Sequence, residues 1–242
     1  MTTGPGSGEL QAVVERYARR DLQDPRYSLL RPDVQHSVHE RQRATLRLLA
    51  KLQREQPGWP ALHELRLVEV GCGNGSNLLE LLRYGFAPEN LTGLELLPDL
   101  VELARAHLPA TLHIRQGDAS VATIVPKSQH IVLASTVFSS LLDQGFQQQL
   151  ARSMWSWLKP GGGVLWYDFT FDNPKNPDVR GVPLARVRAL FPQAQVTSRR
   201  ITLAPPLARL VCCWHPGLYP VFNALRPLRT HILAWLAKPA QP

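Results

Sequence analysis

Cysteine and long apolar runs are scarce in this sequence, and both absences narrow the classes of protein that it can encode. The three cysteines, Cys72, Cys212 and Cys213, form no CxxC pair and no even set, which excludes a disulfide framework and suits a reducing compartment. No run of about 18 apolar residues occurs, so a membrane-spanning helix is not expected. The N-terminal MTTGPGSGEL lacks the basic-then-apolar layout of a signal peptide. We therefore expect a cytoplasmic protein.

Blocks of like charge are also missing, although the chain is basic. The formal net charge is +8 and the isoelectric point is about 9.9. Arginines enrich the first quarter of the chain, but they are scattered rather than gathered in runs of about five or six. Nucleic acid is therefore not the partner that we expect, whereas the positive potential favours small acidic ligands and anionic surfaces.

Strand-like and helix-like segments alternate along most of the chain. Its 242 residues, 44% of them hydrophobic, are enough for one α/β domain. The pattern predicts strands at 65–70, 90–95, 111–115, 131–134 and 163–167, and helices at 76–84, 98–107 and 144–158. Strands separated in this way pair in parallel through right-handed crossovers, which predicts a doubly wound fold. A helix at 184–190, a strand at 195–202 and either a strand or a helical turn at 231–238 follow.

The first sixty residues have a different pattern. Apolar residues between Glu9 and Gln53 recur at helical spacing, interrupted around Asp24-Pro25 and Arg31-Pro32. We expect two helices joined by a proline-containing elbow. The domain prediction is thus an N-terminal helical extension or lid at 1–60 and an α/β domain at 61–242, with a cap insertion at 203–230.

Glycines at alternate positions follow the first predicted strand, in the sequence Glu69-Val70-Gly71-Cys72-Gly73-Asn74-Gly75. Glycine lets the backbone turn sharply and approach a ligand closely. A glycine-rich turn alone is a weak indication, because dinucleotide-binding folds use one too. The spacing here is GxGxG rather than GxGxxG, with an acidic residue two positions before the first glycine. This combination favours a ligand that carries an ammonium and a sulfonium group over a pyrophosphate.

Two further turns at the same sheet edge carry carboxylates. Glu95 ends the second strand, where a carboxylate can accept hydrogen bonds from both ribose hydroxyls. Asp118 and Ala119 follow the third strand, where a short carboxylate can accept from an adenine amine and a small side chain leaves room for the ring. The alternatives are a surface glutamate at Glu95 and a helix N-cap at Asp118.

At this point the sequence resembles the class I S-adenosylmethionine-dependent methyltransferases over about residues 65–170. The segments that carry the resemblance, in order and spacing, are VEVGCGNGS, LTGLE, GDA, HIVLASTVFSSL and LKPGGGVLWYDF. It implies a three-layer, mainly parallel seven-stranded sheet whose last strand is antiparallel, with an N-terminal helical lid. It also implies that S-adenosyl-L-methionine is the cofactor. The cofactor residues implied are Glu69, Gly71, Cys72, Gly73 and Gly75 for the methionine moiety, Glu95 with Leu96 for the ribose, Asp118 and Ala119 for the adenine, and Ser135 at the methyl-transfer site.

The sequence indicates less about the molecule that accepts the methyl group. A sulfonium methyl group is already activated, so a general base is needed only for a hydroxyl or a protonated amine. Ordinary turn chemistry and exposed histidines are the alternatives to a role in binding. The candidate substrate residues are Asp172, Asn173, Arg180, His36 and His39.

The segment YDFTFDNPKNPDVRGV looks like one in small-molecule and sugar-modifying bacterial methyltransferases. No Asn/Asp-Pro-Pro-Tyr motif follows the fourth strand, which argues against adenine-N6 or glutamine methylation. No HxxH-plus-acid metal set is evident, so no metal is expected. We therefore expect methyl transfer to an oxygen of a small polar molecule, such as a sugar or polysaccharide precursor.

Two rival functions stay open at this stage. A non-catalytic partner protein could keep the same cofactor pocket. An NAD-dependent oxidoreductase would share the sheet, but it should show GxGxxG and a catalytic Tyr/Lys or His.

The role of the apolar, proline-rich segment at 203–228 is also open. It either packs into the core, caps the pocket, or rests on a membrane surface. In the last case, apolar residues flanked by Arg209, Arg226 and Arg229 would make the contact.

Overall fold

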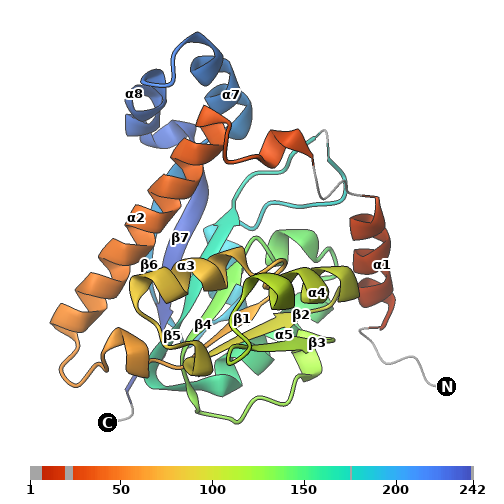
Figure 1. The fold of residues 1–242 in the computed structure, drawn as a ribbon, viewed down its shortest axis with the longest axis vertical. Coiled ribbons are helices and arrows are strands. Elements are labelled where there is room, and N and C mark those ends of the chain that lie inside the picture. Colours follow the sequence, from red (N-terminus) through yellow and green to blue (C-terminus); the bar gives the residue numbers. More distant parts are fainter. Residues whose placement is uncertain (1–6, 20–23, 175, 241–242) are drawn as a thin grey trace.

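The strands form one seven-stranded sheet in the computed structural model, which describes residues 7–19, 24–174 and 176–240 (Figure 1). The order is β3-β2-β1-β4-β5-β7-β6, and only β7 runs antiparallel to its neighbours. The strands are β1 (Leu67–Val70), β2 (Leu91–Glu95), β3 (His113–Gln116), β4 (Gln129–Ser135), β5 (Leu158–Phe169), β6 (Gln195–Leu203) and β7 (Arg229–Ala237). The predicted doubly wound sheet with an antiparallel last strand is confirmed.

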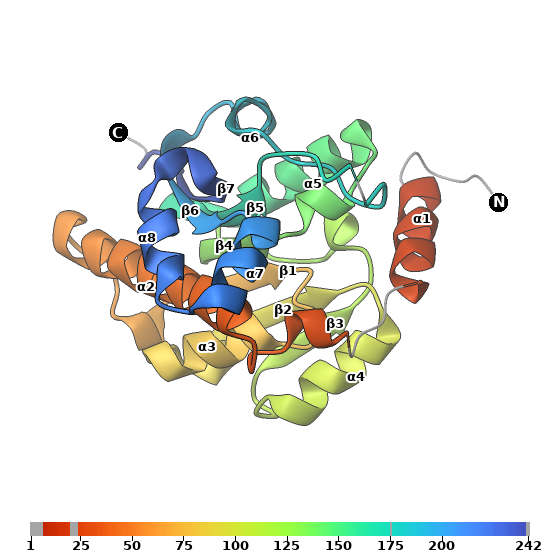
Figure 2. The same ribbon diagram turned by 90° about the horizontal axis from the view of Figure 1, so that it is seen from above.

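Helices cover both faces of this sheet and make it the middle of three layers (Figures 1 and 2). The helices are α1 (Ser7–Ala18), α2 (Pro32–Glu55), α3 (Ser76–Tyr84), α4 (Pro98–His107), α5 (Gln144–Trp157), α6 (Leu184–Leu190), α7 (Pro205–Trp214) and α8 (Leu218–Ala224). Apolar residues of α2, α3 and α4 build the core on one face, and those of α5 and α6, with Val13 of α1, build it on the other.

Local chemistry accounts for these elements. All four residues of β1 are buried, as expected for a parallel strand covered on both faces. Asp143 caps α5 because its carboxylate accepts the Phe146 N–H at 2.6 Å. Helix α3 ends at Gly85, whose left-handed backbone lets its N–H bond back to the preceding turn.

The structure also resolves what the sequence pattern left open. The segment at 231–238 is a strand, β7, which pairs with both β5 and β6. Strand β5 begins at Leu158 rather than Gly163, because the LKPGGG segment already pairs with β4 through a register shift. The apolar segment after β6 folds as two short helices, α7 and α8.

The N-terminal segment consists of two helices, as the pattern predicts, although residues 1–6 and 20–23 of the proposed 1–60 extension lie outside the described residues. The two helices lie apart from each other. Helix α2 packs against β6, β7 and α7, whereas α1 lies on the opposite side of the molecule (Figure 2). The two helices of the proposed extension therefore cover different parts of the molecule.

Candidate active site

A cavity of about 290 Å³ opens where β1, β2 and β4 end at their carboxyl termini. Ligands of doubly wound folds bind at this edge. Eight of the residues predicted to bind the cofactor line it, and two, Glu69 and Gly75, do not. The eight are Gly71, Cys72, Gly73, Glu95, Leu96, Asp118, Ala119 and Ser135.

The turn after β1 depends on glycine at defined positions. Gly71, Gly73 and Gly75 have φ angles of 61°, 57° and 82°, a region that side chains disfavour. A Cβ on Gly71 would lie 2.9 Å from Val137 Cγ2. Gly75 does not line the cavity, because it begins α3 and packs against Leu108. The turn therefore presents bare backbone toward the cavity.

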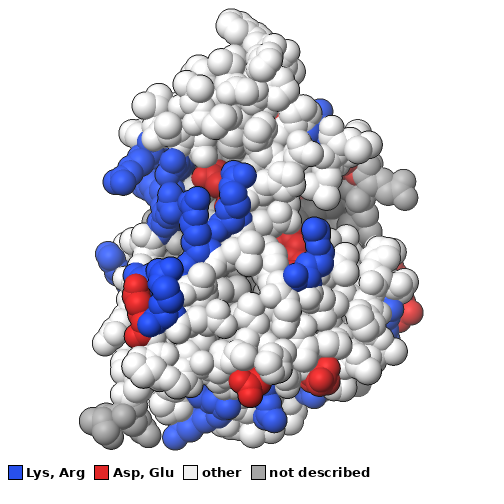
Figure 3. Space-filling model, turned by 60° about the vertical axis from the view of Figure 1, so that its left-hand side comes forward, with Lys and Arg blue, Asp and Glu red and all other residues white. Residues whose placement is uncertain are grey.

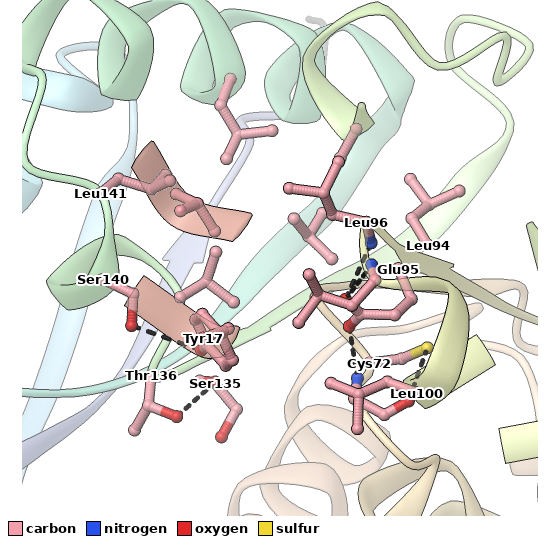
Figure 4. A pocket seen from close by; sticks show the side chains of 18 of the residues that line it. Tyr17, Cys72, Leu94, Glu95, Leu96, Leu100, Ser135, Thr136, Ser140 and Leu141 are labelled. Atoms are coloured by element: carbon pink, nitrogen blue, oxygen red, sulfur yellow. Dashed lines mark hydrogen bonds between the residues drawn. The ribbon is translucent and has the colours of Figure 1, made fainter. Parts of the chain in front are cut away.

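Glu95 joins this turn to the second strand. Its Oε2 accepts the Gly73 N–H at 2.8 Å, and its Oε1 accepts the N–H groups of Leu96 and Leu97 at 2.8 and 2.9 Å. Figure 4 shows Glu95 beside Leu96 and Cys72 at the cavity wall. The prediction that the glycine turn and the strand-two carboxylate adjoin each other is met by this geometry.

Glu69 lies behind the cavity wall rather than in it. The residue is fully buried, and Asn77 of α3 donates to its Oε1 at 2.6 Å. Burial raises its pKa to about 8, against the lowering effects of the Asn77 hydrogen bond and of Arg41. Its Oε2 has no hydrogen-bond partner. A buried carboxylate in this state has unused capacity to accept a hydrogen bond from a cationic group.

Asp118 is the N-cap that the sequence left open as an alternative, and its position also leaves a role in cofactor binding available. It lines the cavity with Ala119. Its carboxylate also caps the short 3₁₀ helix Ala119–Val121, because it accepts the Ser120 N–H at 2.7 Å and the Ser120 hydroxyl at 2.8 Å. The cap holds the carboxylate in a fixed orientation at the cavity wall.

The end of β4 supplies a hydroxyl-lined wall opposite Glu95. Ser135 and Thr136 line the cavity, and Figure 4 shows them facing Glu95 and Leu96 across it. Thr136 has a φ of 56°, uncommon for a β-branched residue. Its N–H donates to the Tyr167 carbonyl at 2.7 Å, and its hydroxyl donates to the Ser135 carbonyl at 2.7 Å. A strained residue held by two hydrogen bonds is typical of a functional site.

Helix α1 closes the cavity through residues that the sequence analysis did not single out. Leu10, Val13 and Tyr17 line it, and the Tyr17 hydroxyl lies 3.5 Å from the Ser140 hydroxyl. The helix is fixed by Arg16, which pairs with Glu9 at 2.6 Å and donates to the Ser140 carbonyl at 3.0 Å. Glu9 in turn accepts the Leu142 N–H at 2.8 Å.

Arg41 of α2 is a second residue that the sequence analysis missed. It lines the cavity, and its guanidinium lies 5.4 Å from the centre of the Tyr167 ring. Its nearest acid is Glu80, at 3.6 Å. Arg41 was hard to find because it is one of many arginines in the first quarter of the chain; only the docking of α2 shows which one faces inward.

The five predicted substrate residues do not lie together, and none of them lines the cavity described above. Asp172 and Arg180 line a second cavity of about 430 Å³, where Asp172 accepts the Gly181 N–H at 2.8 Å. Asn173 is exposed and lines neither cavity.

The two histidines of α2 also lie outside both cavities. His36 stacks on Tyr219 of α8 with ring centres 4.8 Å apart, and His39 is exposed. Residues two apart on a helix point about 200° from each other. His39 therefore points away from the cavity that Arg41 faces.

Comparison with known proteins agrees with this architecture. Residues 67–162 match the model of a methyltransferase domain family. The chain is 28% identical over 187 residues to trans-aconitate 2-methyltransferase of Paracidovorax citrulli, covering 73% of this chain and 67% of that protein.

Two solved structures share the fold. One is a putative methyltransferase of Haloferax volcanii in complex with its Trm112 activator, with a TM-score of 0.56 and 17% identity over 97% of this chain and 98% of that one. The other is phosphoethanolamine N-methyltransferase 2 of Haemonchus contortus bound to S-adenosyl-L-methionine, with a TM-score of 0.55 and 16% identity over 80% of this chain and 52% of that one.

The sheet order, the glycine turn, the family match over residues 67–162 and the curated relative support a class I S-adenosylmethionine-dependent methyltransferase. Within the described residues, no group of three or more His, Cys, Asp or Glu side chains could hold a metal ion. In the same residues, no helix is long and apolar enough to cross a bilayer.

Proposed function

We propose that the cavity holds S-adenosylmethionine in one orientation, from Gly71 at its amino-acid end to Asp118 at its base. The backbone of the glycine turn binds the methionine moiety, and Glu69 behind it stabilises the ammonium group. Glu95 binds the ribose, and Asp118 with Ala119 binds the adenine. The unpartnered Oε2 of Glu69 and the lack of room for a Cβ at Gly71 support this assignment. When bound, this cofactor supplies a methyl group on a positively charged sulfur.

We further propose that the acceptor is a small anion, methylated on an oxygen. The observation that carries this proposal is the position of Arg41, the cationic side chain among the described residues that line the cavity. A guanidinium held over Tyr167 presents donors that match a carboxylate. The similarity to an enzyme named for trans-aconitate supports the same class of acceptor.

An anionic oxygen also removes the need for a general base. A carboxylate is ionised at neutral pH and attacks without losing a proton. The remaining task is to hold acceptor and methyl carbon in line and to exclude water. Tyr17, Ser135 and Thr136 place hydroxyl groups for the first purpose. The apolar residues of α1 cover the cavity for the second.

An acceptor screen with Arg41→Gln tests this proposal. We expect a 14-dalton gain, detected by mass spectrometry, on small di- or tricarboxylic acids and not on neutral sugars. Loss of one charged hydrogen-bonding partner costs about 1.5–3 kcal/mol, so kcat/KM for the acid should fall about 10- to 150-fold. Arg43→Gln is the matched control, because Arg43 is exposed on the same helix.

The possible results distinguish a role of Arg41 in binding the acceptor from a role in binding the cofactor. Unchanged affinity for S-adenosylmethionine in Arg41→Gln, with a loss of acceptor turnover, supports the proposal. Weaker cofactor binding with the same acceptor KM would assign Arg41 to the cofactor carboxylate instead. Methylation of neutral sugars by both variants at the wild-type rate would contradict an anionic acceptor.

A further inference from the structure

Helices α7 and α8 form a hairpin between β6 and β7 that projects from the rest of the molecule (Figures 1 and 2). Its outer surface is apolar. Leu210 and Trp214, one turn apart on α7, are 58% and 80% exposed, and Val221 and Leu225 at α8 are 62% and 56% exposed. Helices α7 and α8 contact each other, and several large apolar side chains exposed on one such hairpin are uncommon on a protein that has no partner for them.

The outer surface is not needed to hold the hairpin together. The hairpin has its own small core, formed by the opposite side of the same helices, in which Ala208, Val211, Cys212 and Tyr219 are buried. Tyr219 also fixes it to α2: its ring stacks on His36, and its hydroxyl lies 3.4 Å from Glu40 Oε2. The exposed apolar side chains are therefore free for another surface.

The charges around the hairpin point to the nature of that surface. No Asp or Glu follows Asp178 in the sequence, and no charged residue occurs between Arg209 and Arg226. Figure 3 shows an uncharged tip, with Lys and Arg side chains gathered on the face below it. Exposed arginines lie on both elements under the hairpin, α2 and β6, which pack against each other. The pattern is an apolar tip flanked by positive charge.

We propose that this hairpin docks on an anionic lipid bilayer, with Leu210, Trp214, Val221 and Leu225 entering the headgroup region. Apolar and aromatic side chains flanked by arginines bind such interfaces through burial and attraction to acidic lipids. A second copy of the chain is a poorer occupant, because a symmetric dimer would bring this positively flanked surface against an identical, equally positive surface. The proposal is independent of the acceptor and concerns where the enzyme works.

Co-flotation of the full chain with vesicles tests the proposal. We expect binding to vesicles of phosphatidylcholine mixed with phosphatidylglycerol and not to phosphatidylcholine alone, with loss of binding at high salt. Leu210→Ser with Trp214→Ser should abolish flotation. Each of Arg209→Gln and Arg226→Gln should weaken it about fivefold, the effect of one cation near an anionic surface.

A matched control and a local probe make the result specific. Val121 and Val125 are similarly exposed, in the β3–β4 connection, and Val121→Ser with Val125→Ser should leave flotation unchanged. Cys213 on α7 is exposed whereas Cys72 and Cys212 are buried, so an environment-sensitive fluorophore attached to it should shift to the blue on mixed vesicles.

Three results would overturn the proposal. They are no flotation of the wild-type chain with mixed vesicles, equal flotation of the Leu210→Ser/Trp214→Ser variant, and a dimer in solution that this variant dissociates. Methyl transfer to a soluble acceptor should be the same in the variant and in the wild type, so that failure here leaves the proposed function untouched.

Discussion

Glu95 shows most clearly what a single residue contributes to this site. Its carboxylate accepts three backbone N–H groups, one of them from the glycine turn that follows a different strand. The residue therefore both orders the turn and places a carboxyl group at the cavity. Its position was predictable from sequence, since the end of the second strand always faces the first turn in a doubly wound sheet.

Replacing Glu95 should weaken cofactor binding strongly. We expect Glu95→Gln to raise the dissociation constant for S-adenosylhomocysteine about 10- to 150-fold, because hydrogen bonds to a charged group contribute about 1.5–3 kcal/mol. Isothermal titration calorimetry measures this directly. Glu102→Gln, on the exposed face of α4, should bind as the wild type does. Equal affinities for the two variants would remove Glu95 from the cofactor site.

Glu69 predicts a pH dependence of stability. Its pKa is about 8 in the fold and about 4.5 ordinarily. Between these values the folded chain holds a proton that the unfolded chain has lost, so the free energy of unfolding falls as pH rises through this window. Glu69→Gln cannot titrate. The melting temperature of the ligand-free wild type should therefore decline relative to that of the variant from about pH 5 to about pH 8.

Bound S-adenosylhomocysteine provides the control for this titration. Its ammonium group should stabilise the ionised Glu69 carboxylate and shrink the difference between the two melting curves. Parallel curves for wild type and Glu69→Gln without ligand would show that Glu69 does not titrate in this range.

At the scale of elements, the sheet was predictable and the site was predictable only in part. Parallel strands such as β1 and β4 are covered on both faces and appear in the sequence as short, mainly apolar buried runs at 67–70 and 131–134. The helices α7 and α8 were not predicted, because prolines and apolar residues all round obscure a helical period. Leu10, Val13 and Tyr17 were missed as site residues because their helix is held at the cavity by contacts with Ser140 and Leu142. These contacts, made by Glu9, Arg16 and Tyr17, join residues more than 120 positions apart in sequence.

The docking of α1 gives a prediction at this scale. Arg16 is buried and bonds both Glu9 and the Ser140 carbonyl. Removing one partner of a buried pair leaves the other uncompensated. We expect Arg16→Ala to release α1, increase amide hydrogen exchange in residues 10–17 at least tenfold, and raise KM for both substrates. Arg19→Ala removes an exposed pair with Asp178 and should change neither quantity more than about twofold.

Equal rates of amide hydrogen exchange in residues 10–17 of the Arg16→Ala and Arg19→Ala variants would contradict the proposed role of α1 as a lid. A rise in exchange confined to α1, with an unchanged melting temperature, would show that the helix opens without unfolding the sheet.

At the scale of the whole molecule, the two proposals concern different ends of one fold. The cavity proposed for the cofactor lies at the carboxyl edge of β1, β2 and β4, and the apolar hairpin projects beyond β6 and β7 (Figure 1). The net charge of the sequence could not have predicted the position of the cavity or of the hairpin. Only the structure distinguishes the arginines of α2 from one another. It places Arg41 at the cavity and leaves other arginines of the helix exposed on the surface below the hairpin.

A crystal structure of the chain with S-adenosylhomocysteine tests the central claim most directly. The account predicts that the ligand fills the cavity under α1, with its ribose hydroxyls on Glu95, its adenine against Asp118 and Ala119, and its amino-acid end on the turn at 71–73. A ligand found in the cavity lined by Asp172 and Arg180, or with its ribose away from Glu95, would contradict the account.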